Sequence, residues 1–193
     1  FFKNDYTGNE ADNLDAASGK LKLYWKMNSR FNANLLVNYE YSDQGGYPYG
    51  LMDMTTGKIG NVNYNEYSSY RRGVLTSGLT LNYSFDNFLL KLVTGYQYSD
   101  DRQAIDQDFT PKPLYFVTQT QRQHMISQEL EMRSAGDHRY TWLNGFFAFH
   151  QSSVSSVNVS PTLKDYDSPT DGFAFYHQST LKDLIFEKLS ATV

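Results

Sequence analysis

Cysteine is absent from the 193 residues of this chain, which excludes disulfide bonds, thiolate chemistry and zinc sites with cysteine ligands. Positive charge is also scarce, because 17 Lys and Arg stand against 21 Asp and Glu, a formal net charge of −4. Such a balance gives no basic surface, so we expect no nucleic-acid partner. No stretch approaches 18 consecutive apolar residues, which excludes a transmembrane helix.

Aromatic residues are abundant in this chain. It has 16 Tyr and 13 Phe, but only 5 Pro. Tyrosine combines an apolar ring with a polar hydroxyl group, and membrane proteins carry such residues where the bilayer meets water. The composition therefore favours a protein whose rings lie at a membrane–water boundary.

Apolar and polar residues alternate along several long segments. In GVLTSGLTLNYSF, residues 73–85, Leu79 and Leu81 belong to one parity, and Thr80 and Asn82 to the other. A period of two is that of a β-strand with one apolar and one polar face. The pattern recurs in KLKLYWKM and FNANLLVNYEY, residues 20–27 and 31–41.

Eight such segments are separated by connections of two lengths. The predicted strands are 20–27, 31–43, 71–85, 88–99, 119–133, 139–151, 172–182 and 186–193. The predicted tight turns are 28–30, 86–87, 135–138 and 183–186, and the long connections are 44–70, 100–118 and 152–171. Short and long connections alternate strictly, which places all the turns at one end of a sheet and all the long loops at the other.

The alternation of short turns and long loops is typical of a transmembrane β-barrel. We predict an all-β fold, an antiparallel up-and-down meander of about eight strands that forms part of such a barrel. A secreted or periplasmic β-sandwich is the alternative. In the barrel, the lipid face would carry Leu35, Val37, Leu75, Leu79, Leu81, Leu90 and Leu92, and the lumen face Thr80, Asn82, Lys91 and Glu129.

Several stretches resemble the barrel of TonB-dependent outer-membrane receptors, especially the siderophore-receptor type. They occur in the order KLKLYWKMNSRFNANLLVNYEYSD, LVTGYQYSDDRQAIDQDFTPKP, QHMISQELEMRS and YTWLNGFFAFHQ. The resemblance extends over most of the chain, from about residue 15 to residue 193. It rests on the order and spacing of the stretches more than on any one of them.

The resemblance implies an outer-membrane protein that takes up a scarce ligand, a ferric siderophore-like iron complex. Haem, cobalamin and glycan receptors share the same barrel pattern and remain alternatives. The implied partners are outer-membrane lipid, a small-molecule ligand such as a ferric chelate, and the TonB system acting through a plug domain. No plug-like α/β segment is recognised in the sequence, so we expect residues 1–193 to be a single barrel segment with no cofactor.

The connection 44–70 holds the candidate ligand-binding residues. It is rich in tyrosine and ends at two arginines, and the candidates are Tyr47, Tyr49, Tyr64, Tyr67, Arg71 and Arg72. Ring faces and guanidinium groups can stack on and clamp an anionic or aromatic ligand. The alternative is that the tyrosines simply pack the loop, and that Tyr70 belongs to an aromatic girdle.

No motif for catalysis or metal binding accompanies these residues. The acidic stretch at Asp100, Asp101, Asp106 and Asp108 offers oxygen ligands that suit calcium, but it lacks the spacing and glycine of an EF-hand. We therefore expect neither a metal site nor an enzyme. The alternative function is a self-contained eight-stranded outer-membrane barrel with a structural or adhesive role, whose interior would be filled by side chains.

Overall fold

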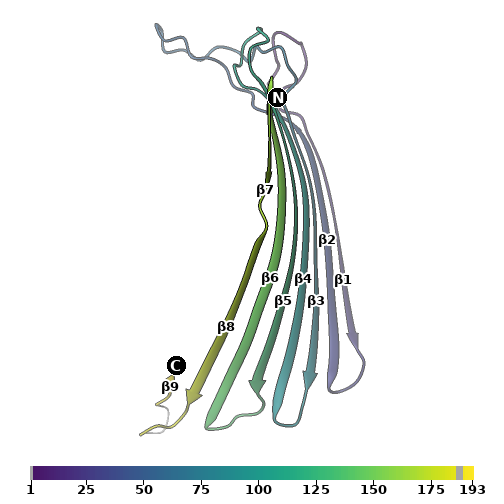
Figure 1. Ribbon diagram of the computed structural model, residues 1–193, viewed down its shortest axis with the longest axis vertical. Helices are drawn as coiled ribbons and strands as arrows, with labels where there is room; N and C mark the ends of the chain where they lie inside the picture. The colour runs from purple at the N-terminus through teal and green to yellow at the C-terminus, as the bar shows by residue number, and fades with distance from the viewer. Residues whose placement is uncertain (1, 186–188) are drawn as a thin grey trace.

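A computed structural model describes residues 2–185 and 189–193 of the chain (Figure 1). These residues form one long antiparallel sheet of nine strands and contain no helix. The strands are β1 (Leu14–Lys26), β2 (Phe31–Gly45), β3 (Ser69–Ser84), β4 (Phe88–Asp106), β5 (Phe116–Ser134), β6 (Tyr140–Val159), β7 (Thr162–Asp167), β8 (Thr170–Leu181) and β9 (Ala191–Thr192). In the part of the chain that is described, no helix is long and apolar enough to cross a membrane.

The strands follow one another across the sheet as a meander, which confirms the predicted fold class. Their order is β1-β2-β3-β4-β5-β6-β8-β9, with β7 paired to β6 outside this path. Figure 1 shows the strands side by side in a curved sheet, with the short turns at its lower end and the longer loops gathered at its upper end. The turns at 28–30, 86–87 and 135–138 lie where they were predicted.

Several strands are longer than the sequence predicted. β4 continues to Asp106 and β5 begins at Phe116, so most of the predicted connection 100–118 is paired strand. The apolar alternation stops near residue 99, but the backbone ladder continues, because pairing of the backbones does not require apolar side chains. Likewise, most of the connection 152–171 is strand: β6 continues into it as far as Val159, and β7 folds back on β6 as a hairpin.

The last predicted strand, 186–193, is partly outside the described residues. Within the described residues 189–193, the strand is Ala191–Thr192, and it pairs with the end of β8. Among the described residues, β1 pairs with β2 alone and β9 with β8 alone. The sheet is therefore open, and it does not show the eight-stranded closure that a self-contained barrel requires.

The register divides the side chains between two faces, because residues directly opposite in an antiparallel pair point to the same side. One face, called the apolar face below, carries all seven leucine and valine residues predicted for lipid contact. The other, called the polar face, carries Thr80, Asn82, Lys91 and Glu129. The predicted grouping of these residues is thus confirmed.

The apolar face is exposed, not packed into a core. Phe173, Phe175 and Trp25 lie on it with 83%, 72% and 59% of their surfaces accessible. The buried hydrophobic residues in the described part of the chain are Ala11, Val62 and Tyr64, and all three lie outside the strands. Backbone pairing, not side-chain burial, therefore holds the sheet together.

Aromatic rings mark the turn end of the apolar face. Trp25 meets Phe31 edge-on at 6.3 Å, and Phe31 lies 6.5 Å from Tyr83. The row continues through Phe85, whose ring stacks on Phe88 at 4.2 Å. A second group lies further up the same face, where Tyr39 and Tyr98 share a level and Tyr98 contacts His124 at 4.7 Å. Two aromatic rows thus bracket the apolar part of this face.

Gly145 and Gly78, both on the polar face, test whether the Tyr176 ring needs the space that a glycine leaves. A side-chain carbon on Gly145 would overlap the Tyr176 ring, whereas Gly78 has open space around it. We expect Gly145→Ala to displace this ring, break its 2.7 Å hydrogen bond to Glu129, and weaken β6–β8 pairing by about 1–3 kcal/mol. Gly78→Ala should be nearly neutral. Amide hydrogen exchange along β8 measures the difference, and equal exchange in the two variants would contradict this account.

Candidate functional site

A cap formed by three segments covers the loop end of the sheet. The segments are the N-terminal residues 2–13, the loop 46–68 and the loop 107–115, and Figure 1 shows the loops gathered there. Ala11, Val62 and Tyr64 pack together in the cap, with Phe109 against them. This is the hydrophobic core of the described residues, and it holds loops far apart in the sequence against one another.

Paired hydrogen bonds fix the N-terminal segment to the loop 46–68. The Asn4 side chain donates to the Tyr64 carbonyl at 2.8 Å and accepts from the Tyr64 amide at 3.3 Å. The Tyr64 hydroxyl donates to the Gly46 carbonyl at 3.1 Å. Burial raises the pKa of Tyr64, so the phenol stays a neutral donor at physiological pH.

Two aspartates tie the loop 107–115 to the same cap. Asp106 is 1% exposed and accepts from the backbone amides of Glu66 and Phe109, both at 3.1 Å. Asp108 accepts from the Tyr115 amide at 3.0 Å and from Thr110. Partial burial works to raise the pKa of Asp108, but the bonds from Thr110 and Tyr115 outweigh it and lower the pKa. Both carboxylates therefore act as loop supports.

Below the cap, two hollows open on the polar face and share Arg72. The smaller, about 290 Å³, is lined by Tyr70, Arg72, Gln97, Ser99, Asp101, Gln103, Gln119, Gln121 and Gln123. The larger, about 530 Å³, is lined by Ala16, Ala17, Ser18, Glu40, Tyr41, Ser42, Arg72 and Val74. We call the two together the Arg72 hollow. The smaller hollow is lined chiefly by polar side chains, the lining of the larger includes Ala16, Ala17 and Val74, and both are open.

Arg72 is held at the centre of this hollow by a carboxylate on the next strand. Its Nε lies 3.4 Å from Oδ1 of Asp101, which is directly opposite in the β3–β4 register. The Tyr70 hydroxyl donates to the same oxygen at 2.6 Å. The guanidinium is half exposed, so part of its donor fork remains available to a ligand. Amide side chains supply most of the other polar groups.

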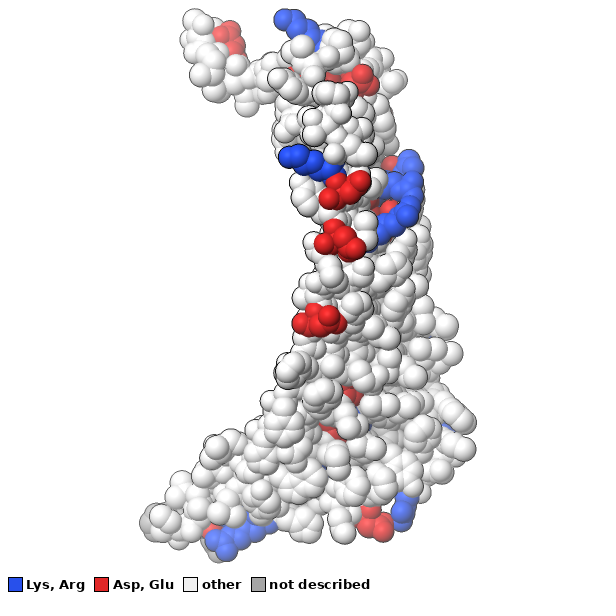
Figure 2. All heavy atoms as spheres, in the orientation of Figure 1, with Lys and Arg blue, Asp and Glu red and all other residues white. Residues whose placement is uncertain are grey.

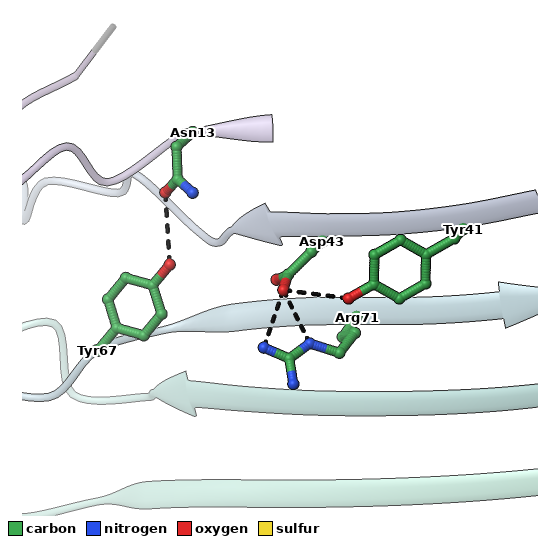
Figure 3. Close-up of polar contacts among 5 residues, drawn as sticks. All are labelled: Asn13, Tyr41, Asp43, Tyr67 and Arg71. Atoms are coloured by element: carbon green, nitrogen blue, oxygen red, sulfur yellow. Dashed lines mark hydrogen bonds and ion pairs between the residues drawn. The ribbon is translucent and has the colours of Figure 1, made fainter. Parts of the chain in front are cut away.

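The structure separates the six candidate residues into different environments. Arg72 lies in the hollow, but Arg71 points to the apolar face, because neighbouring residues of a strand alternate. The Arg71 guanidinium pairs there with Asp43, as Figure 3 shows. The two arginines therefore cannot clamp one ligand together.

The four candidate tyrosines also differ in exposure. Tyr64 is 2% exposed and belongs to the core of the cap. Tyr47 reaches the rim of the hollow, where it accepts a hydrogen bond from Gln103, and burial raises its pKa. Tyr49 packs edge-on against Phe109 at 5.3 Å but remains largely exposed. The exposed Tyr67 donates to Asn13 at 3.4 Å (Figure 3). Contact of any of them with a ligand stays a prediction.

The glutamines of the hollow were not identified from the sequence. Gln119, Gln121 and Gln123 occur in QTQRQ at a period of two, so they share one face of β5. This period of two could have predicted that the three glutamines share a face. It attracted no functional prediction, because the stretch matches no catalytic or metal-binding motif. Residues 2–185 and 189–193 contain no group of three or more His, Asp or Glu side chains that could hold a metal ion.

Comparisons with known proteins reveal a relationship of fold. No family model matches the chain, and no curated protein matches its sequence. Among solved structures, it is similar to the crystal structure of the ferric yersiniabactin uptake receptor FyuA from Yersinia pestis, with a TM-score of 0.70 and 18% sequence identity. The similarity covers 93% of this chain and 29% of the receptor.

This similarity confirms that the sheet has the fold of part of a receptor β-barrel, as the sequence resemblance predicted. The chain spans less than a third of that receptor's length. At 18% identity, the likeness concerns the fold alone.

Asn4 and Asn9 test the role of the cap's hydrogen bonds. We expect Asn4→Ala to remove both bonds to Tyr64 and to lower the local opening free energy by about 1–3 kcal/mol, because the buried Tyr64 amide loses its partner. Asn9→Ala, an exposed change in the same segment, should have little effect. Amide exchange at Tyr64 reports the opening, and unchanged protection in Asn4→Ala would show that other contacts hold the segment.

Proposed function

We propose that the chain is a segment of an outer-membrane TonB-dependent receptor that takes up a scarce ligand, a ferric siderophore-like iron complex. In this proposal the apolar face contacts outer-membrane lipid and the polar face lines the interior of the barrel. The TonB system acts through a plug that these residues do not supply. The observation that carries the proposal is the two-faced sheet, exposed and apolar on one side, with a polar hollow on the other.

The dimensions of the apolar face fit a bilayer. From Phe88 in the lower aromatic row to Tyr98 in the upper one, β4 advances by ten residues, or roughly 33 Å at about 3.3 Å per residue. A strand tilt of about 40° reduces this to roughly 25 Å along the membrane normal, the height of the apolar band in outer-membrane barrels. A large exposed apolar surface also needs a partner, and lipid supplies it.

The Arg72 hollow gives the proposed ligand a place on the polar face. It lies below the cap, so a ligand that passes the loops would meet Arg72 and the surrounding amide groups. A guanidinium with free donors suits the carboxylate or phenolate oxygens of a ferric chelate. The solved receptor that shares this fold is a ferric yersiniabactin uptake receptor, and the ligand class proposed here is based on the ligand in that receptor's name.

The alternative of a self-contained eight-stranded barrel has less support. It requires the first and last strands to pair, whereas β1 and β9 lie at opposite edges of the described sheet. Open edges in hydrocarbon leave backbone groups without hydrogen bonds. Further strands of a larger barrel would satisfy them.

Leu79 and Thr80 test which face meets lipid. They are neighbours on β3 that point to opposite faces, and Leu79 lies between the two aromatic rows. Leu79→Arg should destabilise membrane folding by about 2–4 kcal/mol, since a charge then faces the bilayer interior. Thr80→Arg should be mild. Urea titration of the full-length protein in lipid vesicles provides the comparison, and equal losses would mean that the faces are wrongly assigned.

Arg72 and Arg71 test the ligand site. Cells that express the full-length protein should accumulate iron-55 from at least one member of a panel of ferric siderophores, and Arg72→Gln should reduce this uptake by about tenfold or more, as expected for a lost charge-assisted contact of at least 1.4 kcal/mol. Arg71→Gln, on the opposite face, should leave uptake unchanged. Absence of uptake from every ferric siderophore tested, with the protein correctly assembled, would overturn the proposed ligand class.

A further inference from the structure

Uncharged polar side chains of two neighbouring strands line the smaller part of the Arg72 hollow. The register places Ser99 of β4 opposite Gln123 of β5, and Gln103 opposite Gln119, with Asp101 between these pairs. A wall of this kind presents dipoles, not charges, to a ligand. We call it the amide block, and its members are Gln97, Ser99, Gln103, Gln119, Gln121 and Gln123.

Half of these side chains are free to bind a ligand. Gln121 donates to the Ser153 hydroxyl at 3.3 Å, and Gln103 donates to Tyr47. The amides of Gln97, Gln119 and Gln123 form no hydrogen bond with another residue that the structure describes. Because an amide side chain both donates and accepts, these three offer both kinds of hydrogen bond to a ligand in the hollow.

The charges of the hollow do not favour an anion. Its lining holds one cation, Arg72, whose Nε already lies 3.4 Å from Asp101. The second carboxylate of the lining belongs to Glu40, which accepts from the Asn38 amide at 2.8 Å and forms no ion pair within the described residues. The hollow therefore has an excess of one negative charge.

The cap above the hollow is also acidic. Figure 2 shows that Lys and Arg side chains are few on the visible side of the molecule and that most of this surface is uncharged. A negative excess along the route to a site lowers the local concentration of anions. In the cap, three lysines stand against six carboxylates, Lys3, Lys58 and Lys112 against Asp5, Glu10, Asp12, Asp53, Glu66 and Asp108.

A ligand without net charge suits these surroundings. Entry into the hollow removes water from the ligand, and this transfer is costly for a net charge that finds no partner. The Arg72 guanidinium can donate to one coordinated oxygen of a chelate, but it cannot balance several negative charges while Asp101 holds it. A cationic ligand would in turn face this half-exposed guanidinium.

We propose that the Arg72 hollow selects ferric chelates of zero net charge, in which three anionic ligating groups balance the iron, and excludes chelates with excess negative charge. The inference rests on the proposed function and deepens it, because it names the charge class of the ligand. The amide block binds uncharged donors and acceptors on the outside of the chelate, and Arg72 donates to a coordinated oxygen.

The test compares a panel of uncharged ferric trihydroxamates with a panel of ferric tricatecholates, which carry three negative charges. Cells that express the full-length protein are treated with an uncoupler, so that retained iron-55 reports binding without energised uptake. We expect the unmodified protein to retain at least one trihydroxamate, and about tenfold less or lower of every tricatecholate.

Charge variants show whether the hollow is the cause. Gln119→Lys combined with Gln121→Lys adds two cations to the amide block and should raise tricatecholate retention by about tenfold or more. Thr118→Lys combined with Thr120→Lys adds the same charge to the opposite face of β5 and should leave retention unchanged. Asp101→Asn removes a negative charge at nearly constant size and should act in the same direction as the glutamine variant. Recovery in the outer-membrane fraction verifies assembly of each variant.

Two results would overturn the inference. One is retention of a tricatecholate by the unmodified protein at the level of the best trihydroxamate. The other is unchanged tricatecholate retention in both the double glutamine variant and Asp101→Asn. Either result leaves the proposed function intact, because a ferric chelate still binds. Failure of the assembled protein to retain any chelate of either panel would instead refute the proposed function.

Discussion

The continuous ladder of backbone hydrogen bonds is the constraint on which this structure depends. β4 and β5 pair along all 19 residues of each, and the described strands bury no hydrophobic side chain. Packing therefore cannot correct an error in pairing, and a slip of one residue would exchange the two faces completely. The hairpin turns, with strict alternation along the strands, fix the register and hence every surface of the sheet.

The alternation that defines the faces was readable from the sequence, but the strand ends were not. Apolar periodicity stops near Ser99, whereas the ladder runs on to Asp106 through polar residues that leave no such signal. The separation of Arg71 and Arg72 followed from the same period of two and could have been predicted. The burial of Tyr64 could not, because it depends on Asn4, a partner 60 residues away in the chain.

The Arg71–Arg72 dipeptide illustrates how a strand places identical side chains in unlike surroundings. Arg72 meets Asp101 within a hollow lined by amides, while Arg71 meets Asp43 on the face that carries the leucines. Their pairing partners come from different neighbouring strands, β4 for one and β2 for the other. The amino-acid composition does not distinguish the two arginines. Their positions in the strand register determine which groups each one can contact.

On the polar face, two aromatic rings occupy the space beside glycines. The Tyr176 ring covers Gly145, and the Phe149 ring covers Gly172. Each glycine therefore leaves room for a large side chain of the neighbouring strand. In a barrel that includes this sheet, a single added methyl group at either glycine would push the neighbouring ring away from the wall and towards the interior.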